Sequence, residues 1–296
     1  MPALKKVGVI VAGHLQPIDG FKEGLQELGW IEGSNVSSEL RAAEGALDRL
    51  PGLASEIVRL NVDVIAVIGA VTVGAVRKVT SNIPIVFSIV VEPIGDGMAL
   101  NLDHPGGNVT GVTTFDPKQA EIQIGFLHNV ILGLERVAIL SDLGVSECMS
   151  RSNREAALEL GIKPQVIRVK GPSPDYLEVF RTMEREGAQA LIVLEEPINV
   201  SRRKAIAELA LARKLPTIFA REQADAGGLF AYGTSLREAA RAMAPYVDKI
   251  LKGADAGSLP IRAVLKHELV INLQTARSIG VTIPDALIKR ADRVVR

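Results

Sequence analysis

The chain has 296 residues, enough for two domains of ordinary size that each bury a core. Its 34 lysines and arginines balance its 34 aspartates and glutamates, so the formal net charge is zero. This balance argues against a nucleic-acid partner, and so does an aromatic content of 4%, which leaves few side chains for stacking on bases. The single cysteine, Cys148, excludes an internal disulfide and a cysteine metal cluster.

The first half of the chain alternates between two hydrophobic patterns. Apolar and β-branched runs predict buried strands at 7–11, 35–40, 63–68 and 85–91. Apolar residues at helical spacing predict helices at 20–28, 50–60 and 73–79, and a short helix at 98–102. The strand starts are separated by roughly 29, 27 and 22 residues, the length of a βαβ unit. This spacing predicts a parallel sheet.

A second series of the same kind follows the β-branched run at 109–115. It predicts strands near 136–140, 165–169, 189–194 and 217–220, and helices at 153–160, 175–186 and 199–214. Beyond it we expect a strand at 229–232, a helix at 235–252 kinked by Pro245, a strand at 268–272, and helices at 275–279 and 284–292. The sequence therefore predicts an α/β protein of two doubly wound, Rossmann-like lobes.

Signatures of catalysis are absent from the sequence. It has no Gly-x-Gly-x-x-Gly opening a helix after a strand, no Walker loop, no Gly-x-Ser-x-Gly and no His-Glu-x-x-His, and its four histidines are scattered. We therefore expect no catalytic residue, no cofactor and no metal. An enzyme on a doubly wound fold remains an alternative class, which turnover of a bound ligand would revive.

Polar residues instead follow the predicted strands. Ligands of open α/β sheets bind beyond the carboxyl ends of the strands, so these positions predict a binding site without a reaction. The candidates are His14, Glu44, Thr72, Glu92, Asp142, Glu195, Glu196, Arg221 and Glu222. The alternative for each is a helix cap or a solvated loop residue. Arg221 and Glu222 pair either with each other or with a charged ligand.

Thr72 is the strongest single candidate. The stretch Gly69-Ala70-Val71-Thr72 lies between a buried strand and a predicted helix, so Thr72 can cap that helix while free backbone amides bind an anion. The alternative is a cap without a ligand. For Glu92, the alternative is a structural role in which its carboxylate accepts N–H groups of the loop.

Several segments carry a resemblance to a known family. They are TSNIPIVFSIVVEPIGDG, PGGNVTGVTTF, GGLFAYGTSLREAARAMAPYVDKILKGADAGSLPI and HELVINLQTARSIGVTIPDALIKRAD. The chain resembles, over almost its whole length, the substrate-binding proteins of ABC transporters with the type I periplasmic-binding fold. Within that fold it is similar to the family of the tryptophan/tyrosine uptake binding proteins. The resemblance implies a monomer that captures an amino acid or a related carboxylate by hinge closure and delivers it to an ABC permease.

The resemblance also implies how the chain is divided. It places three crossings between the lobes near 113–116, 232–234 and 263–268, with Thr113, Thr114, Tyr232 and Gly233 as hinge residues. The lobes would then be 1–115 with 233–264, and 116–232 with 265–296. An alternative for Tyr232 is an aromatic wall of the ligand site, and another is a place in the core.

The resemblance points to Ala70, Thr72 and Val91 as residues that hold the ligand's carboxylate and ammonium. Family members carry a Gly-Thr pair directly after the third strand, whereas here Ala70 and Val71 separate Gly69 from Thr72. This departure leaves the ligand's identity open.

The family is extracytoplasmic, in the periplasm or on a lipid anchor. No stretch reaches the ~18 apolar residues of a membrane-spanning helix, and residues 1–4 run straight into a strand, so we expect that a leader has been removed. The alternative function is a ligand-sensing regulatory or receptor module of the same fold.

Overall fold

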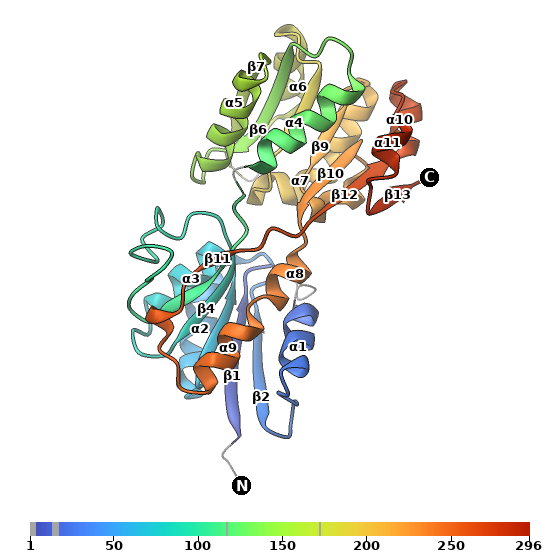
Figure 1. Cartoon of the computed structure of the whole chain (residues 1–296). Coiled ribbons are helices and arrows are strands. Elements are labelled where there is room, and N and C mark those ends of the chain that lie inside the picture. The colour runs from blue at the N-terminus through green and yellow to red at the C-terminus, as the bar shows by residue number, and fades with distance from the viewer. Residues whose placement is uncertain (1–3, 14–17, 117, 172) are drawn as a thin grey trace. The chain divides into compact units, whose positions relative to one another are not determined.

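The computed structural model describes residues 4–13, 18–116, 118–171 and 173–296. The chain divides into two compact units, which we call the first unit (Met1–Phe115 with Leu236–Leu265) and the second unit (Asp116–Ser235 with Lys266–Arg296). Each unit has its own sheet and its own helices (Figure 1). The chain thus passes from one unit to the other three times. At the second passage the second unit extends to Ser235, three residues beyond the sequence-based boundary at residue 232. At the third passage it resumes at Lys266, one residue later than the sequence-based division placed it.

The first unit is built on a six-stranded sheet in which all pairs are parallel, in the order β11-β5-β4-β3-β1-β2. Its strands are β1 (Lys5–Val11), β2 (Val36–Ala42), β3 (Val64–Ile68), β4 (Ile85–Val90), β5 (Val109–Thr113) and β11 (Arg262–Ala263). Its helices are α1 (Ile18–Glu27), α2 (Leu50–Arg59), α3 (Ala70–Arg77), α8 (Leu236–Arg241) and α9 (Ala244–Leu251), with short 3₁₀ turns at Leu47–Arg49 and Ala256–Ser258.

Helices cover both faces of this sheet, which explains why its central strands are apolar throughout. All five residues of β3 are buried. One hydrophobic cluster joins the sheet to α1, α8 and α9, and the other joins it to α2 and α3. Helices α1 and α8 pack so closely that a Cβ on Gly20 would lie 2.2 Å from the Arg237 carbonyl oxygen. Glycine is therefore required there.

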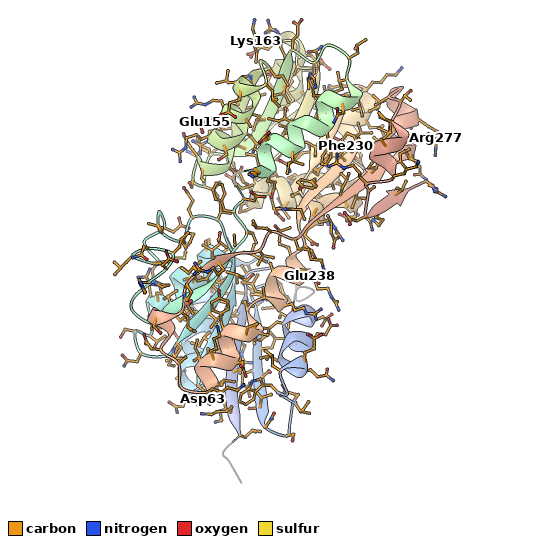
Figure 2. The ribbon with its side chains drawn as sticks, viewed as in Figure 1. Asp63, Glu155, Lys163, Phe230, Glu238 and Arg277 are labelled. Atoms are coloured by element: carbon orange, nitrogen blue, oxygen red, sulfur yellow. The ribbon has the colours of Figure 1, made fainter. Side chains whose placement is uncertain are left out.

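The second unit has a seven-stranded sheet in the order β13-β12-β10-β9-β8-β6-β7. Its strands are β6 (Arg136–Asp142), β7 (Lys163–Val169), β8 (Ala190–Val193), β9 (Thr217–Phe219), β10 (Phe230–Thr234), β12 (His267–Asn272) and β13 (Arg293–Val295). Its helices are α4 (Lys118–Val130), α5 (Cys148–Glu159), α6 (Tyr176–Arg185), α7 (Pro197–Ala212), α10 (Leu273–Ile279) and α11 (Asp285–Ile288), with a 3₁₀ helix η2 (Arg221–Ala226). Phe230 (Figure 2) lies in its core.

One pair of strands in the second unit is antiparallel. β10 ends at Thr234, where the chain leaves the unit, and β12 begins at His267, where the chain returns. These two residues are paired, so β12 runs back along β10. The remaining pairs are parallel, as the βαβ spacing predicts.

Three predicted helices differ from the structure. Residues 98–102 form bends and irregular backbone after a turn at 93–97, and the N–H groups of Met98 and Ala99 donate to the Pro93 carbonyl. The helix expected at 235–252 is broken rather than kinked: Pro245 occupies the first turn of α9, where a missing N–H costs no hydrogen bond. The helix expected at 284–292 is only α11, and β13 follows it.

The two sheets share one strand order. Counted along each unit, the second strand lies beside the first, and the third, fourth and fifth follow on the other side of the first. Strand order therefore reverses between β1 and β3 in the first unit and between β6 and β8 in the second. Ligands of doubly wound sheets bind beyond the carboxyl ends of the strands at such points, which places the candidate sites of both units.

Candidate functional site

In the first unit, the reversal point is formed by the ends of β1 and β3. His14 follows β1 but lies outside the described residues. Gly69 follows β3 and is the N-cap of α3, with a positive φ of 94° and no side-chain capping bond. A positive φ at this turn favours glycine over residues that carry a Cβ.

Thr72 is not the cap of this helix, contrary to the sequence-based prediction. Helix α3 begins at Ala70, and Thr72 lies inside its first turn. The side chain is fully buried, and its hydroxyl donates a hydrogen bond to the Ile68 carbonyl at 2.9 Å. Thr72 therefore ties the first turn of α3 to the end of β3.

The start of α3 presents two backbone donors. The N–H groups of Thr72 and Val73 donate to the Gly69 carbonyl at 3.1 and 3.3 Å. For the preceding N–H groups of Ala70 and Val71, no acceptor is present among the residues that the structure describes. The Val71 residue is 51% exposed. Two donors at the positive end of a helix dipole stabilise an anion, such as a carboxylate.

The end of β4 has an unusual backbone. The pairing of β4 with β5 shifts register between Phe87 and Val90, and within this bulge Ile89 has a φ of 59°. A β-branched residue is strained at a positive φ, and such strain is maintained only where surrounding contacts enforce it. One such contact is the Thr113 hydroxyl, which donates to the Val90 carbonyl at 2.7 Å.

The two residues after this bulge are candidates from the sequence. Val91 is half-buried, and its carbonyl lies 3.4 Å from the Thr113 hydroxyl. The Glu92 carbonyl accepts the Asp96 N–H at 2.8 Å, which closes the following turn. Burial and, secondarily, the charge of Glu92 raise the pKa of Asp96. Thr114, a predicted hinge residue, continues the ladder through its N–H to the Val90 carbonyl at 3.4 Å.

Glu44 lies in the turn after β2, with a φ of 55°. Its side chain is 67% exposed, and one carboxylate oxygen lies 3.9 Å from Arg49. The structure thus places Glu44 in a solvated turn.

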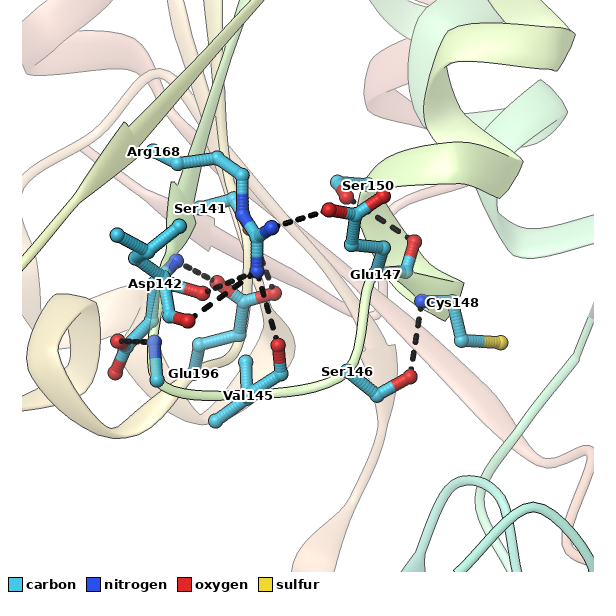
Figure 3. A network of polar contacts seen from close by, with 11 residues as sticks. Ser141, Asp142, Val145, Ser146, Glu147, Cys148, Ser150, Arg168 and Glu196 are labelled. Carbon is cyan, nitrogen blue, oxygen red and sulfur yellow. Dashed lines mark hydrogen bonds and ion pairs between the residues drawn. The ribbon is translucent and has the colours of Figure 1, made fainter.

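In the second unit, the reversal point is formed by the ends of β6 and β8. Asp142, the last residue of β6 (Figure 3), lies at the start of the loop after this strand. Its carboxylate accepts the Gly144 N–H at 2.7 Å and the Ile198 N–H at 3.3 Å. Its carboxylate therefore links the loop after β6 to the first turn of α7.

Glu196 also links the end of β6 to the start of α7, with its side chain reaching from the helix to the strand. It is the N-cap residue of α7, but its side chain turns to β6, where it accepts hydrogen bonds from the Ser141 hydroxyl at 3.2 Å and from the Asp142 N–H. The residue is only 3% exposed. Burial raises the pKa of Glu196 to about 7, although both hydrogen bonds favour its ionised form.

Arg168, which the sequence analysis did not single out, organises the loop after β6 (Figure 3). From β7 its guanidinium forms an ion pair with Glu147 and donates to the carbonyl oxygens of Asp142 at 3.3 Å and Val145 at 3.0 Å. Its position within a predicted β-branched strand was the available signal, because a charged residue there needs a specific partner.

Glu195 differs from its neighbour Glu196. Among the described residues, no hydrogen-bond donor reaches its carboxyl group. The residue is half-buried. Burial and, secondarily, the nearby charge of Glu222 raise the pKa of Glu195 to about 8.

Arg221 and Glu222 open η2, directly after β9. The Arg221 guanidinium pairs with Glu268 of β12 at 2.5 Å, a partner 47 residues away in the sequence. Glu222 is exposed on η2. The next residue, Gln223, is only 1% exposed, and neither atom of its amide has a hydrogen-bond partner within the described part of the chain. The sequence analysis missed Gln223 because nothing in its local pattern predicts burial.

The predicted hinge residues of the second unit lie in its core. The Tyr232 ring stacks on His267 with centroids 5.3 Å apart and meets the edge of Phe126 at 5.1 Å, which favours the core role over an aromatic wall. His267 Nε2 lies 3.6 Å from an Asp116 carboxylate oxygen. Gly233, with a φ of 156°, follows Tyr232 in β10. One cluster therefore joins residues from all three passages between the units.

The polar groups at these strand ends can bind a charged ligand. Within the described ranges, no group of three or more histidine, cysteine, aspartate or glutamate residues has the arrangement needed to hold a metal ion. In the same ranges, no helix is both long and apolar enough to cross a bilayer. The first unit offers backbone donors for an anion, and the second offers carboxyl groups for a cation.

Comparison with known proteins identifies the family of this chain. Residues 6–295 match the model of the ABC transporter substrate binding protein family. A tyrosine-binding protein of Clostridioides difficile (strain R20291) is 22% identical over 274 residues, which cover 88% of this chain and 75% of the relative.

Solved structures show the same architecture. The ABC domain in complex with L-Trp from Streptococcus pneumonia has a TM-score of 0.88 at 22% identity, with 99% of this chain and 100% of that chain covered. A conserved domain protein from Vibrio cholerae has a TM-score of 0.87 at 25% identity and the same coverage. The predicted fold class, two doubly wound lobes of the type I periplasmic-binding kind, is confirmed.

Proposed function

The chain belongs to the family of ABC transporter substrate-binding proteins, and from this premise we propose that it captures a free amino acid outside the cytoplasm for import. The ligand class we propose is an α-amino acid with an aromatic side chain. Capture would occur by closure of the two units on the ligand, and release would occur at an ABC permease.

The observation that carries this proposal is the opposite polarity of the two strand-end regions. In the first unit, the N–H groups of Ala70 and Val71 lack acceptors among the described residues. In the second unit, the half-buried Glu195 lies near the charge of Glu222. An α-amino acid carries a carboxylate, which suits the first set, and an ammonium, which suits the second.

The relatives support an aromatic side chain. One curated relative is named for binding tyrosine, and the similar Streptococcus structure holds L-Trp. The half-exposed Val71 offers an apolar contact at the start of α3, next to the proposed carboxylate donors. Val91 at the end of β4 is a further proposed contact from the first unit.

Closure follows from ligand contacts with both units. A ligand that contacts Ala70 and Val71 alone stabilises no particular arrangement of the units, whereas one that also contacts Glu195 favours the closed arrangement by the additional interaction energy. The segments that bend would lie at the three passages, near Thr113 and Thr114 and beside Tyr232 and Gly233.

A thermal-shift screen against the twenty amino acids tests this proposal. A ligand present at about 100 times its Kd adds about 2.7 kcal/mol to the free energy of unfolding, so the melting temperature rises visibly. We expect L-tryptophan or L-tyrosine to give the largest rise. No rise with any amino acid would contradict the proposed ligand class.

The Ala70→Pro variant tests the proposed carboxylate site. Proline is well tolerated at the first position of a helix and removes one N–H, so α3 is retained while a donor is lost. We expect affinity to fall by about 10-fold to 100-fold, the value of a hydrogen bond to a charged group. Ala70→Ser keeps the N–H and is the matched control. Equal affinities of the two variants would contradict a carboxylate at this position.

Delivery to a permease is tested with the permease in membranes. We expect the ligand-loaded chain to stimulate ATP hydrolysis by its partner ABC transporter, and the ligand-free chain to do so less. Binding without stimulation would favour a ligand-sensing module instead.

A further inference from the structure

We propose that the second unit carries a further binding site, for a small organic carboxylate, in a cavity between α4 and α11 (Figure 1), with Arg290 as the residue that holds the carboxylate and Asn129 as a hydrogen-bond donor to it. The site is separate from the strand-end region of this unit, because none of its residues follows β6, β8 or β9. It therefore does not depend on the proposed capture of an amino acid.

The first observation is the cavity itself. It has a volume of about 180 Å³ and is lined by Asn129, Pro284, Ala286, Leu287 and Arg290. Leu287 is buried and belongs to the same hydrophobic cluster as Phe126, so the floor of the cavity is apolar. At ~30 Å³ for each water-sized group, the cavity has room for a ligand of about six non-hydrogen atoms.

The second observation is that both polar side chains of the cavity lack partners within the described part of the chain. The Arg290 guanidinium lies over the Phe126 ring, with Cζ 5.9 Å from the ring centre, and this cation–π contact orients it. Phe126 lies one helical turn before Asn129 on α4. Among the described residues, Arg290 pairs with no carboxylate and the Asn129 amide has no hydrogen-bond partner. The N–H donors of both side chains therefore remain available to a ligand.

The charged groups around the cavity leave it positive. Besides Arg290, the charged side chains of α4, of α11 and of the segment after α11 are Lys118, Glu121, Asp285, Lys289, Asp292 and Arg293. With Arg290, these are four cations and three carboxylates. The Asp292 carboxylate accepts the Leu269 N–H at 2.7 Å. His128, on α4, adds positive charge when it is protonated. The local charge thus favours an anion at Arg290.

This combination of groups selects a carboxylate with a short apolar chain. A guanidinium binds a carboxylate through two parallel N–H···O bonds, and an asparagine amide can donate a third. Pro284, Ala286 and Leu287 offer apolar contacts for the rest of the ligand. The butyrate ion has the required charge and about the required size. A cation of the same shape is repelled by Arg290.

NMR titration of the isotope-labelled full chain with sodium butyrate locates the site. We expect the Arg290 Nε–H signal and the Asn129 side-chain amide signals to shift and to reach saturation. Butylamine, which has the same apolar chain and the opposite charge, should cause no such shifts, and neither should sodium chloride at the same ionic strength. Absence of saturable shifts at both residues would overturn the proposal.

Two variants assign the anion to Arg290. Arg290→Gln should lower the affinity for butyrate by about 10-fold to 100-fold, the value of a hydrogen bond to a charged group. Arg293→Gln changes an exposed arginine of β13 that does not line the cavity, and it should bind butyrate like the unmodified chain. Both arginines are exposed, so we expect both variants to keep the melting temperature. Equal affinities of the two variants would overturn the proposal.

The amide contributes less. Asn129→Ala removes a neutral donor and should lower the affinity for butyrate by about threefold. Its melting temperature should also stay unchanged, because the Asn129 side chain is exposed.

The same titration distinguishes this site from the proposed carboxylate site of the first unit. Saturating L-tryptophan should leave the butyrate shifts at Arg290 and Asn129 in place. Butyrate shifts confined to the amides of Ala70 and Val71 would assign the carboxylate to the strand ends and overturn the proposal. If no amino acid binds the chain, the proposed function fails, whereas saturable butyrate shifts at Arg290 still support this site.

Discussion

The strand-end regions of the two units have the same topology and opposite chemistry. Both follow the reversal of strand order in a doubly wound sheet. In the first unit the polar groups are backbone N–H groups at the start of α3, and the one polar side chain of that turn, Thr72, is turned inward to Ile68. In the second unit they are carboxyl groups, of which Asp142 and Glu196 hold the structure together while Glu195 has no hydrogen-bond donor among the described residues.

Within each region, this contrast distinguishes polar groups that hold the scaffold from polar groups that are open to a ligand. A carboxylate that accepts several hydrogen bonds from its own unit has little capacity left for a ligand, as in Asp142 and Glu196. Groups that have no partner among the described residues, such as the Ala70 N–H and the Glu195 carboxyl, retain that capacity. A charged candidate is therefore judged by its existing contacts, not by its position alone.

The largest expected effect comes from reversing the charge of Glu195 in the second unit. Glu195→Lys places a cation where we propose that the ligand's ammonium binds, so affinity for tryptophan or tyrosine should fall more than about 100-fold. Calorimetry measures the affinity, and the exposed Glu208→Lys is the control. A loss of less than about fivefold, with the melting temperature unchanged, would place the ammonium elsewhere.

The next effect concerns the scaffold. Arg168→Met removes the guanidinium that holds Glu147 and the loop carbonyls, and should lower the free energy of unfolding by about 2–3 kcal/mol. Chemical denaturation measures the change. The control is Arg181→Met, because the Arg181–Glu178 pair is exposed on both sides and should contribute about 0.5 kcal/mol or less. Equal losses would show that the loop after β6 does not depend on Arg168.

The contrast also predicts how stability depends on pH in the ligand-free protein. The pKa of Glu195 is raised from 4.5 to about 8 by folding, so between these values the folded state binds a proton that the unfolded state has lost. The free energy of unfolding should therefore fall as pH rises through this range, by on the order of 2 kcal/mol.

Melting temperatures measured from pH 5 to pH 9 check this dependence. Glu195→Gln should remove most of the fall in melting temperature with pH. Glu196, whose pKa is raised to about 7, should account for part of the fall that remains. A melting temperature that rises with pH over this range would show that Glu195 is ionised in the folded protein.

The smallest effect tests the first unit. Thr72→Ala removes the hydroxyl that donates to Ile68 and should lower the free energy of unfolding by about 1 kcal/mol, with little change in ligand affinity. Thr72→Ser keeps the hydroxyl and should behave like the unmodified chain. A loss of affinity above about tenfold in Thr72→Ala, without loss of stability, would show that Thr72 contacts the ligand after all.

The fold was readable from the sequence because each βαβ repeat has a characteristic length and each buried strand is apolar. The exceptions arise where long-range geometry decides. The antiparallel pairing of β10 with β12 depends on where the chain leaves and re-enters the unit, which no local pattern encodes. The early start of α3 depends on the backbone of Gly69, whose positive φ forms the cap without a side chain.

For the candidate site, strand-end positions were predictable but partners were not. Asp142, Glu195 and Glu196 follow predicted strands, yet only the structure shows which of them has hydrogen-bond donors. Arg221 pairs with a residue 47 positions away, and Arg168 binds a carbonyl 26 positions away. Such pairs depend on which strands become neighbours, so sequence spacing alone does not reveal them.

The discontinuous division of the chain has a consequence for its synthesis. β11, at the edge of the first unit's sheet, pairs with β5 but follows it by about 150 residues, and α8 and α9 come equally late. The second unit in turn waits for β12 and β13 near the end of the chain. Neither unit can therefore close its core while the ribosome is still making the middle of the protein. Apolar strands made early remain uncovered during most of translation, and the two halves finish folding almost together.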